Sequence, residues 1–333
     1  MKQQRIEYID LMKGICITMV ILLHCGFFKG ELSIVNEYLK TFRVPLYFFL
    51  IGLFFKPNER FGTLAIKRIN NLVIPYLFFS IILFIPHIIV NPYNQDICSW
   101  QYYFFGLIEP YNYPLWFLRC LFFIYILYYC LCKIITKIHF RIIVSFLISG
   151  IIWFITPIIK TSSHILTEWI FIHMNLLTAL YVLPYIGIAE YFKMKGILSL
   201  QMSYTIKSII FFSCILLLYI FKVNGVDLSQ SLFGNNFISF YISSFAGITA
   251  VIIFAQSVKH LFYLSYIGRY SLIALGCHVM IIISIKGIFP FITEWQLSLV
   301  VLALTPIFIY IFSKIFPYFT AQKKLIKIPH DRQ

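Results

Sequence analysis

Residues 11–29 read LMKGICITMVILLHCGFFK, an apolar stretch with a lysine near its start and a histidine towards its end. About 20 predominantly apolar residues are enough for a helix to cross the hydrocarbon core of a bilayer. Comparable stretches recur along the 333-residue chain, in which 61% of the residues are hydrophobic and 12% are charged, with a mean hydropathy of +0.88. Because a soluble domain carries about a quarter charged residues, the sequence predicts a membrane protein. The stretches lack a period-two alternation, which favours helices over a β-barrel.

Ten such stretches predict an all-α bundle of about ten transmembrane helices. They cover residues 11–29, 39–56, 71–91, 114–133, 140–159, 169–191, 205–223, 237–258, 270–290 and 296–317. Most of the 27 Lys and Arg residues fall in loops on the same side of this topology as the N-terminus. Since basic residues concentrate in cytoplasmic loops, we expect both termini to be cytoplasmic.

The chain carries a net charge of +15 at pH 7. In a soluble protein this excess would suggest a nucleic-acid partner. Here it follows the inside–outside asymmetry of the loops and suits contact with anionic lipids, so we expect membrane lipids and no nucleic acid as partners. We expect one integral-membrane domain, residues 1–333, with a helical core at about 8–317 and a basic cytoplasmic tail at 318–333. The eight Cys residues show no metal-ligand spacing, so no metal site is expected.

The first predicted helix holds the densest set of ionisable residues, Asp10, Lys13 and His24. Ionisable groups inside a membrane are costly unless they are paired or hydrated, which makes them candidates for function. Asp10 and Lys13 are three residues apart and can pair at the inner interface. Lys13 and His24 are eleven residues apart, so they share one helix face with a rise of about 16 Å between them.

These residues allow structural and functional interpretations. Lys13 can be an interfacial anchor whose ammonium extends to the membrane surface. His24 can be a buried imidazole that a neighbouring helix satisfies. Alternatively, an imidazole titrates close to neutral pH and is well suited to take a proton from a hydroxyl group.

Five short segments follow one another in a recognisable order. They are RIEYIDLMKG at 5–14 followed by His24, FRVPLYFFLIG at 42–52, KRINNLVIPY at 67–76, LWFL at 115–118, and IGRYSL at 267–272 followed by His278. With these segments the chain resembles, over about residues 5–315, the membrane acyltransferase-3 family of bacterial integral-membrane O-acyltransferases. The resemblance implies ten helices that transfer an acyl group, usually acetyl, from cytoplasmic acyl-CoA to a hydroxyl of a glycan or lipid-linked sugar on the far side of the membrane.

The resemblance also implies roles for individual residues. His24 would be the catalytic histidine and Lys13 its basic partner, with Asp10 included in the catalytic set through its pairing with Lys13. Lys67 and Arg68, together with Lys13, would meet the phosphates of CoA, although Lys67 and Arg68 equally suit anchors under the positive-inside rule.

The chain departs from the family pattern at three places. Lys13 stands where the family more often has Arg; it keeps the charge but loses bidentate recognition. Asn70 and Asn71 stand where a second basic residue is common. Ile51 replaces a frequent Ser before Gly52, so any role of that hydroxyl is missing.

Four further residues are candidates for binding the acceptor. Trp116 suits an aromatic-belt anchor or a platform that stacks on a sugar. Arg43 and Arg119 can bind an anionic acceptor or serve as anchors, and a charge at Arg119 needs a partner. His278 suits either a structural hydrogen bond or the site. Glu190, near the end of its predicted helix, is expected to form an i,i+3 pair with Lys193.

We therefore expect an O-acyltransferase of the bacterial cytoplasmic membrane that uses acetyl-CoA as a co-substrate and has no permanently bound cofactor. The rival class is an exporter or flippase for a polysaccharide or lipid-linked glycan, because a helix bundle with buried charges can also line a transport pathway. Against this alternative, the sequence shows no pair of Gly- or Pro-broken helices in matching halves and few carboxylates within the predicted spans. A purely structural subunit would not account for the spacing of Lys13 and His24.

Overall fold

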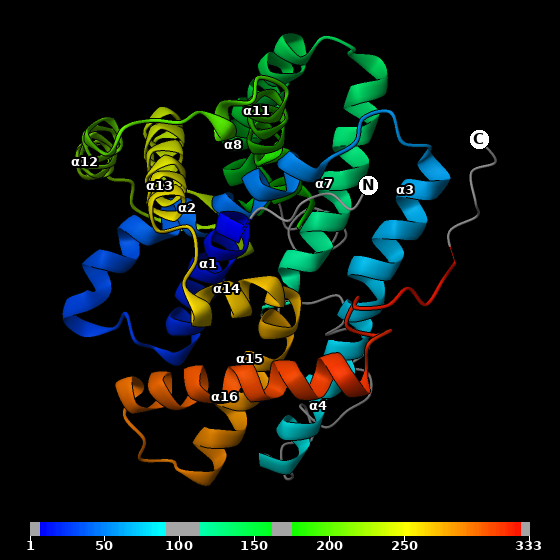
Figure 1. The fold of residues 1–333 in the computed structure, drawn as a ribbon, viewed down its shortest axis with the longest axis vertical. Helices are drawn as coiled ribbons and strands as arrows, with labels where there is room; N and C mark the ends of the chain where they lie inside the picture. Colours follow the sequence, from blue (N-terminus) through cyan, green and yellow to red (C-terminus); the bar gives the residue numbers. More distant parts are fainter. Residues whose placement is uncertain (1–6, 91–113, 162–174, 328–333) are drawn as a thin grey trace.

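The computed structural model describes residues 7–90, 114–161 and 175–327, and nearly all of their regular structure is helical (Figure 1). The first half contains α1 (Glu7–Cys25), α2 (Ser33–Phe54), α3 (Phe61–Arg68), η2 (Ile69–Val73), α4 (Ile74–Val90), α7 (Trp116–Ile134) and α8 (Ile138–Thr161). The second half contains α10 (Leu176–Tyr181), α11 (Leu183–Met194), α12 (Tyr204–Ile220), α13 (Phe237–Val258), α14 (Phe262–Arg269), α15 (Ser271–Ile288) and α16 (Glu294–Ile315). Short 3-10 turns are η1 (Gly30–Leu32), η5 (Ile197–Ser199) and η6 (Leu228–Gln230), and two-residue strands are β1 (Val226–Asp227) and β2 (Leu232–Phe233).

The predicted all-α membrane bundle is confirmed. Within the described ranges, seven helices are long and apolar enough to cross a membrane. The other three predicted spans correspond to α2, to the pair α10–α11, and to the 17-residue helix α12. The start of the predicted span 169–191 lies outside the described residues. The count of ten spans and the cytoplasmic location of both termini stay predictions.

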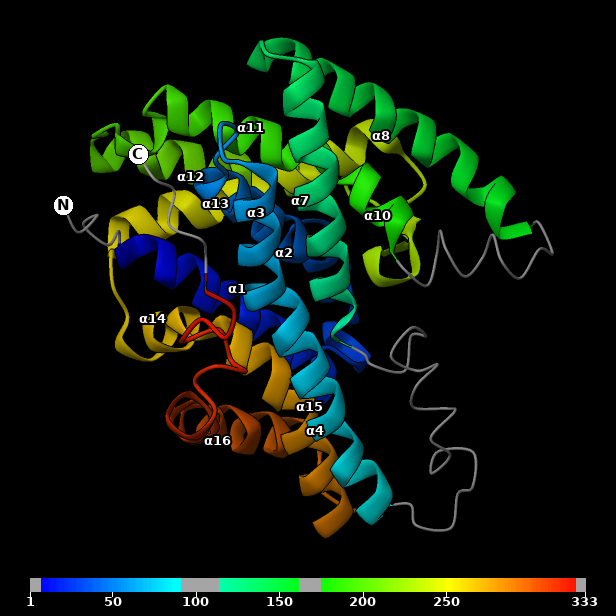
Figure 2. The ribbon, with the colours of Figure 1, turned by 90° about the vertical axis from the view of Figure 1, so that its right-hand side faces the viewer.

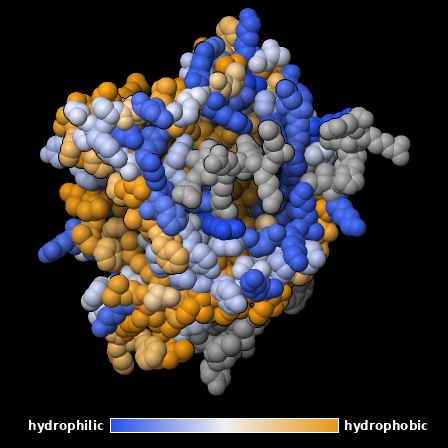
Figure 3. All heavy atoms as spheres, viewed as in Figure 1, coloured by the Kyte–Doolittle hydropathy of each residue, from blue (hydrophilic) through white to orange (hydrophobic). Residues whose placement is uncertain are grey.

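Apolar side chains on the outside of the bundle support a membrane environment. Helix α8 exposes Ile143, Leu147, Ile151, Phe154 and Ile158, each more than half accessible, at spacings that place them along one face. A soluble monomer rarely exposes so extended an apolar surface. Figure 3 shows apolar residues over the region of α16, and hydrophilic residues around a hollow near the centre of this face.

Helix α1 lies in the middle of the bundle and packs against α2, α13, α14, α15 and α16 (Figures 1 and 2). Helices α3 and α4 join through the π-helical turn η2 into one long rod, which runs beside α7 in both views. A π turn inserts one extra residue into a helix and often occurs at functional sites. The central position of α1 lets its polar face meet side chains from several other helices.

Two glycines allow α1 and the short helix α14 to approach closely. A Cβ atom on Gly14 would overlap the carbonyl oxygen of Leu264, and a Cβ atom on Gly268 would overlap the carbonyl oxygen of Asp10. Small residues permit such close contact between membrane helices. Helix α14, which was not among the predicted spans, therefore packs closely against the N-terminal half of α1.

We expect Gly268→Ala to destabilise the protein by about 1–3 kcal/mol, the usual cost of an overpacked core. The measurement is the midpoint of thermal unfolding of the detergent-purified protein. Gly62→Ala is the matched control, because nothing lies within 4 Å of the Cβ that it would add. A Gly268→Ala midpoint equal to that of Gly62→Ala would contradict this packing.

The predicted span 169–191 is interrupted between α10 and α11 at Val182, just before Pro184. The amide of Tyr185 donates to the carbonyl oxygen of Val182 at 3.2 Å, and so does not bind that of Tyr181, its usual partner four residues back. The carbonyl oxygen of Tyr181 instead accepts hydrogen bonds from Ser149 Oγ at 2.8 Å and from the Tyr241 hydroxyl at 2.5 Å. The break is thus satisfied internally, as a membrane environment requires.

A small hairpin, residues 226–233, connects α12 to α13 and is held firmly by α10. Val226 pairs with Phe233 in the antiparallel register of β1 and β2. Thr178 Oγ1 donates to the carbonyl oxygen of Leu228 at 2.8 Å, and the side-chain amide of Asn175 donates to that of Ser229 at 3.0 Å. These side-chain bonds fix the hairpin against the bundle.

Candidate active site

One cavity of about 660 Å³ lies between α1, α2, η2, α7, α15 and the hairpin. It is lined by five of the residues that the sequence singled out, namely Lys13, His24, Arg43, Arg68 and Trp116. Lys13 and His24 were expected on one face of the first helix, and the cavity brings both side chains to the same space. The cavity therefore extends along about three turns of α1, or about 16 Å.

Two hydrogen bonds between α1 and α2 define which ends of the helices meet. The Tyr47 hydroxyl donates to the carbonyl oxygen of Lys13 at 3.3 Å, and Cys16 Sγ donates to that of Arg43 at 2.6 Å. The two helices are thus antiparallel, so the first turns of α2 lie level with the end of α1. In the predicted topology the Lys13 end is the inner end and the His24 end is the outer one.

The inner end of the cavity combines cations with aromatic rings. The guanidinium carbon of Arg68 lies 3.5 Å from the centre of the Tyr125 ring, and Lys13 Nζ lies 5.3 Å from that of Phe54. Cations over aromatic faces are attracted by the ring quadrupole. Asn71, which is exposed, also lines this end, so the cavity opens to the surface there.

Two histidine rings lie side by side at the outer end. The ring centres of His24 and His278 are 5.2 Å apart, with the planes tilted by 40°. His278 is fully buried, and its Nδ1 lies 3.0 Å from the carbonyl oxygen of Ala274. A carbonyl only accepts, so Nδ1 carries a hydrogen in this contact. His278 thus makes a hydrogen bond to the backbone of its own helix, as one interpretation expected. Its ring also packs against that of His24.

Polar side chains from α2 and the hairpin complete the outer end. Arg43, which is 4% exposed, donates from Nη1 to Asn36 Oδ1 at 3.2 Å, so its guanidinium extends two turns towards the start of α2. Asp227 Oδ1 accepts from the Ser229 amide at 3.0 Å and from Ser229 Oγ at 2.5 Å. Trp116 lies against the edge of Phe117, with ring centres 6.0 Å apart. This end offers donors, a carboxylate and an aromatic face.

Four predicted site residues do not line the cavity: Asp10, Lys67, Arg119 and His278. Lys67 forms an ion pair with Glu59 instead. Arg119 is 9% exposed, and its guanidinium carbon lies 5.8 Å from the centre of the Tyr76 ring.

Sequence reasoning missed several lining residues, including Asn36, Tyr47, Tyr125 and Asp227. Asn36 and Arg43 are seven residues apart, which is a helical spacing that could have indicated a shared face. Asp227 gave no such signal, because it reaches the cavity through a hairpin whose position depends on α10.

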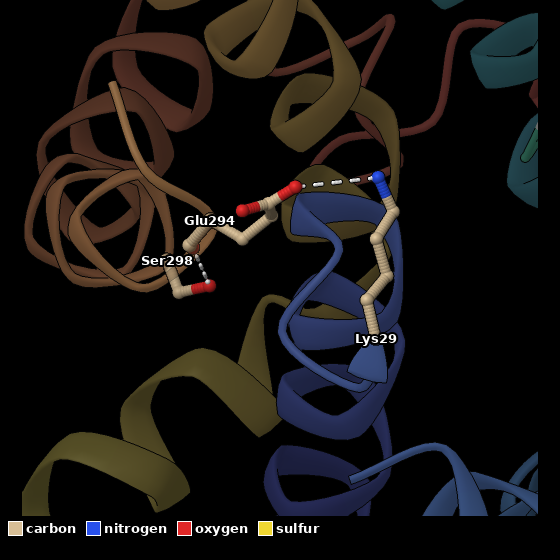
Figure 4. Close-up of polar contacts among 3 residues, drawn as sticks. All are labelled: Lys29, Glu294 and Ser298. Atoms are coloured by element: carbon tan, nitrogen blue, oxygen red, sulfur yellow. Dashed lines mark hydrogen bonds and ion pairs between the residues drawn. The ribbon is translucent and has the colours of Figure 1, made fainter. Parts of the chain in front are cut away.

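The segment after α1 is tied to α16 close to the histidine end. Lys29 Nζ and Glu294 Oε1 are 3.4 Å apart, and Ser298 Oγ donates to the Glu294 carbonyl oxygen at 2.7 Å (Figure 4). Gly26, with φ of 84°, adopts the left-handed turn that ends α1, and an added Cβ would meet Glu294 Cγ at 2.9 Å. The ion pair is exposed and therefore contributes little to stability.

A helical membrane bundle that encloses a largely apolar cavity, with basic side chains at both ends and a histidine at one of them, defines a polytopic membrane protein that binds a ligand between its helices. A family model described as an acyltransferase domain, that of the acyltransferase-3 family, matches residues 6–314. The chain therefore belongs to the acyltransferase-3 family, which indicates acyl transfer as its general activity. Neither the curated proteins nor the solved structures with which the chain was compared gave a match.

Proposed function

We propose that this protein transfers an acyl group, in the simplest case acetyl, from cytoplasmic acyl-CoA to a hydroxyl of a cell-envelope glycan or lipid-linked sugar. We place this reaction in the bacterial cytoplasmic membrane, with His24 as the general base. The observation that carries the proposal is a continuous cavity that joins Lys13 and Arg68 at one end to His24 at the other.

The donor would enter from the inner end. Lys13 and Arg68 offer positive charge for the phosphates of CoA, and the extended pantetheine arm is long enough to carry the thioester along the cavity to His24. Lys67, for which the same role was expected, is paired with Glu59 and is less suited to it.

The acceptor would bind at the outer end. His24 would take the proton of the acceptor hydroxyl as its oxygen attacks the thioester carbonyl. The C–S bond then breaks, and the CoA thiolate leaves and takes up the proton. Arg43 and Asp227 could hold the polar groups of a sugar, and Trp116 could stack on its apolar face. An acyl-histidine intermediate is the less favoured variant.

The transporter alternative would need helices that are broken to bind substrate or ions. The chain does break at Val182, but the Tyr181 carbonyl exposed there is bound by Ser149 and Tyr241 and is not available to a ligand. This favours a structural break over a transport site.

Incubation of the purified protein with acetyl-CoA that carries a labelled acetyl group tests the proposal. We expect release of CoA thiol, detected with a thiol reagent, and transfer of the label to an envelope glycan fraction added as acceptor. A transporter would release no CoA. Protein that releases no thiol in the presence of such fractions would overturn the proposed reaction.

A further inference from the structure

Asn70 makes an unusually complete set of hydrogen bonds in the π turn η2. Its amide nitrogen donates to the carbonyl oxygens of Ile66 and Ile326, and its amide oxygen accepts from the backbone amides of Leu325 and Ile326, all at 2.9 Å. The residue is 2% exposed. A side-chain amide offers two donors and two acceptor positions, so Asn70 uses all of them, and most of them hold the segment that follows α16.

The same segment has a second attachment further along the rod of α3, η2 and α4. The Phe319 ring stacks on the Phe78 ring, with centres 5.4 Å apart and planes 21° apart. Thr320 is fully buried. Figure 2 shows the segment, in red, beside the rod. Residues 318–327, which the sequence suggested as a basic cytoplasmic tail, are therefore fixed against the rod.

This attachment holds two lysines near η2, the turn that also carries Asn71 to the inner end of the cavity. Asn71, next to Asn70, is exposed and lines the opening, and Arg68 lines the cavity one turn before it. Lys324 and Lys327 flank the two residues that Asn70 binds, and both are exposed. The two lysines are thus chain neighbours of residues bound to Asn70, which itself adjoins Asn71.

The charge at this opening is small for a ligand with several phosphates. Of the residues that line the inner end, Lys13 and Arg68 are basic, and Lys67 is paired with Glu59. A nucleotide with a diphosphate and a further phosphate carries more negative charge than these two cations balance. Lysine side chains act as flexible point charges that can reach phosphates from a fixed backbone.

We propose that Lys324 and Lys327, held in place by Asn70, form a phosphate-binding subsite for the nucleotide end of the acyl-CoA donor. This inference rests on the proposed function, since it assumes that the donor enters at the inner end. The C-terminal segment then supplies positive charge near η2, where Asn70 and Asn71 stand in place of a basic residue.

The test compares ligands that differ in the phosphates they carry. Binding of CoA and of pantetheine, which lacks the nucleotide and its phosphates, is measured for wild type and for Lys324→Gln/Lys327→Gln in nanodiscs of phosphatidylcholine. We expect the variant to bind CoA about tenfold more weakly, as the loss of a charge-assisted contact implies, and to bind pantetheine as wild type does. Lys137→Gln/Lys195→Gln, which removes two exposed lysines elsewhere, is the matched control and should bind CoA normally.

A second variant tests the role of Asn70. In Asn70→Ala the segment loses its attachment, so we expect a similar loss of CoA affinity, with no further loss when both lysine substitutions are added. Unfolding midpoints are measured for each protein to check that it folds. If Asn70→Ala does not fold, the lysine variant still tests the subsite, because it keeps Asn70 and the attached segment.

Several results would overturn the subsite. They are an unchanged affinity for CoA in the lysine variant, an equal loss for pantetheine, an equal loss in the Lys137→Gln/Lys195→Gln control, or a loss that occurs in phosphatidylglycerol nanodiscs but not in phosphatidylcholine. The last result would mean that the lysines bind lipid headgroups. Wild-type protein that binds neither CoA nor pantetheine would overturn the proposed function as well.

Discussion

His24→Ala is expected to lower the rate of acyl transfer from acetyl-CoA by about 10²–10⁴-fold, the usual contribution of a positioned general base. The His24 side chain lines the cavity that begins at Lys13 and Arg68, so its loss removes a proton acceptor from the proposed reaction centre. Binding of acetyl-CoA should change little, because the proposed phosphate contacts lie at the other end. The measurements are CoA thiol release in the presence of an envelope glycan acceptor and, separately, the affinity for CoA.

The chain offers a matched histidine control. His260 is exposed and lies in the segment between α13 and α14, so His260→Ala should keep wild-type transfer. A His24→Ala protein with the same rate as His260→Ala would remove His24 from the mechanism. The same proteins are also incubated with labelled acetyl-CoA in the absence of acceptor. A label that remains bound to the wild-type protein but not to His24→Ala would favour the acyl-histidine route.

His278 provides a graded comparison in the same assay. Its Nδ1 is engaged by the Ala274 carbonyl and its ring lies 5.2 Å from that of His24. A positioning role predicts a smaller loss of rate for His278→Ala than for His24→Ala, together with a shifted pH profile of the rate. A merely structural role would lower stability and leave the pH profile unchanged.

The helices and the polar face of α1 could be predicted because both depend on local patterns. Apolar runs of membrane-spanning length gave the positions of the helices, and the spacing of Lys13 and His24 placed them on one face. The cavity between helices depends on contacts between residues far apart in sequence, such as the bond from Thr178 on α10 to the hairpin that carries Asp227. Local spacing carried no information about those contacts.

For two residues, the interaction partner differs from the one that nearby sequence suggested. Glu190 was expected to pair with Lys193 on its own helix, yet its carboxylate accepts from Arg141 on α8. Asn70 was read as a missing basic residue, yet its amide binds the C-terminal segment 255 and 256 residues away. In both cases a distant partner satisfies a buried polar group that could not remain unsatisfied in the membrane.

The contact of Glu190 with Arg141 leads to the second large effect, this time on stability. The Arg141 Nη2 and Glu190 Oε1 atoms are 2.8 Å apart, with each side chain 5% exposed, and the Tyr128 hydroxyl donates to Glu190 Oε2 at 2.6 Å. Removing one member of such a buried pair leaves the other charge without compensation, which costs about 3–5 kcal/mol. We therefore expect Glu190→Gln to lower the free energy of unfolding by this amount, measured as the unfolding midpoint in detergent.

Removing both charges distinguishes this cause from a simple packing defect. In Arg141→Met/Glu190→Leu no buried charge is left unpaired, and replacing a buried ion pair with apolar residues is often neutral or stabilising, so the double variant should unfold at a higher temperature than Glu190→Gln. Glu294→Gln, which breaks the exposed pair with Lys29, should unfold close to wild type, since exposed ion pairs contribute little. The ion pair would not be what holds α8 to α11 at this point if Glu190→Gln had the same unfolding midpoint as Glu294→Gln. The same conclusion would follow if the double variant were less stable than Glu190→Gln.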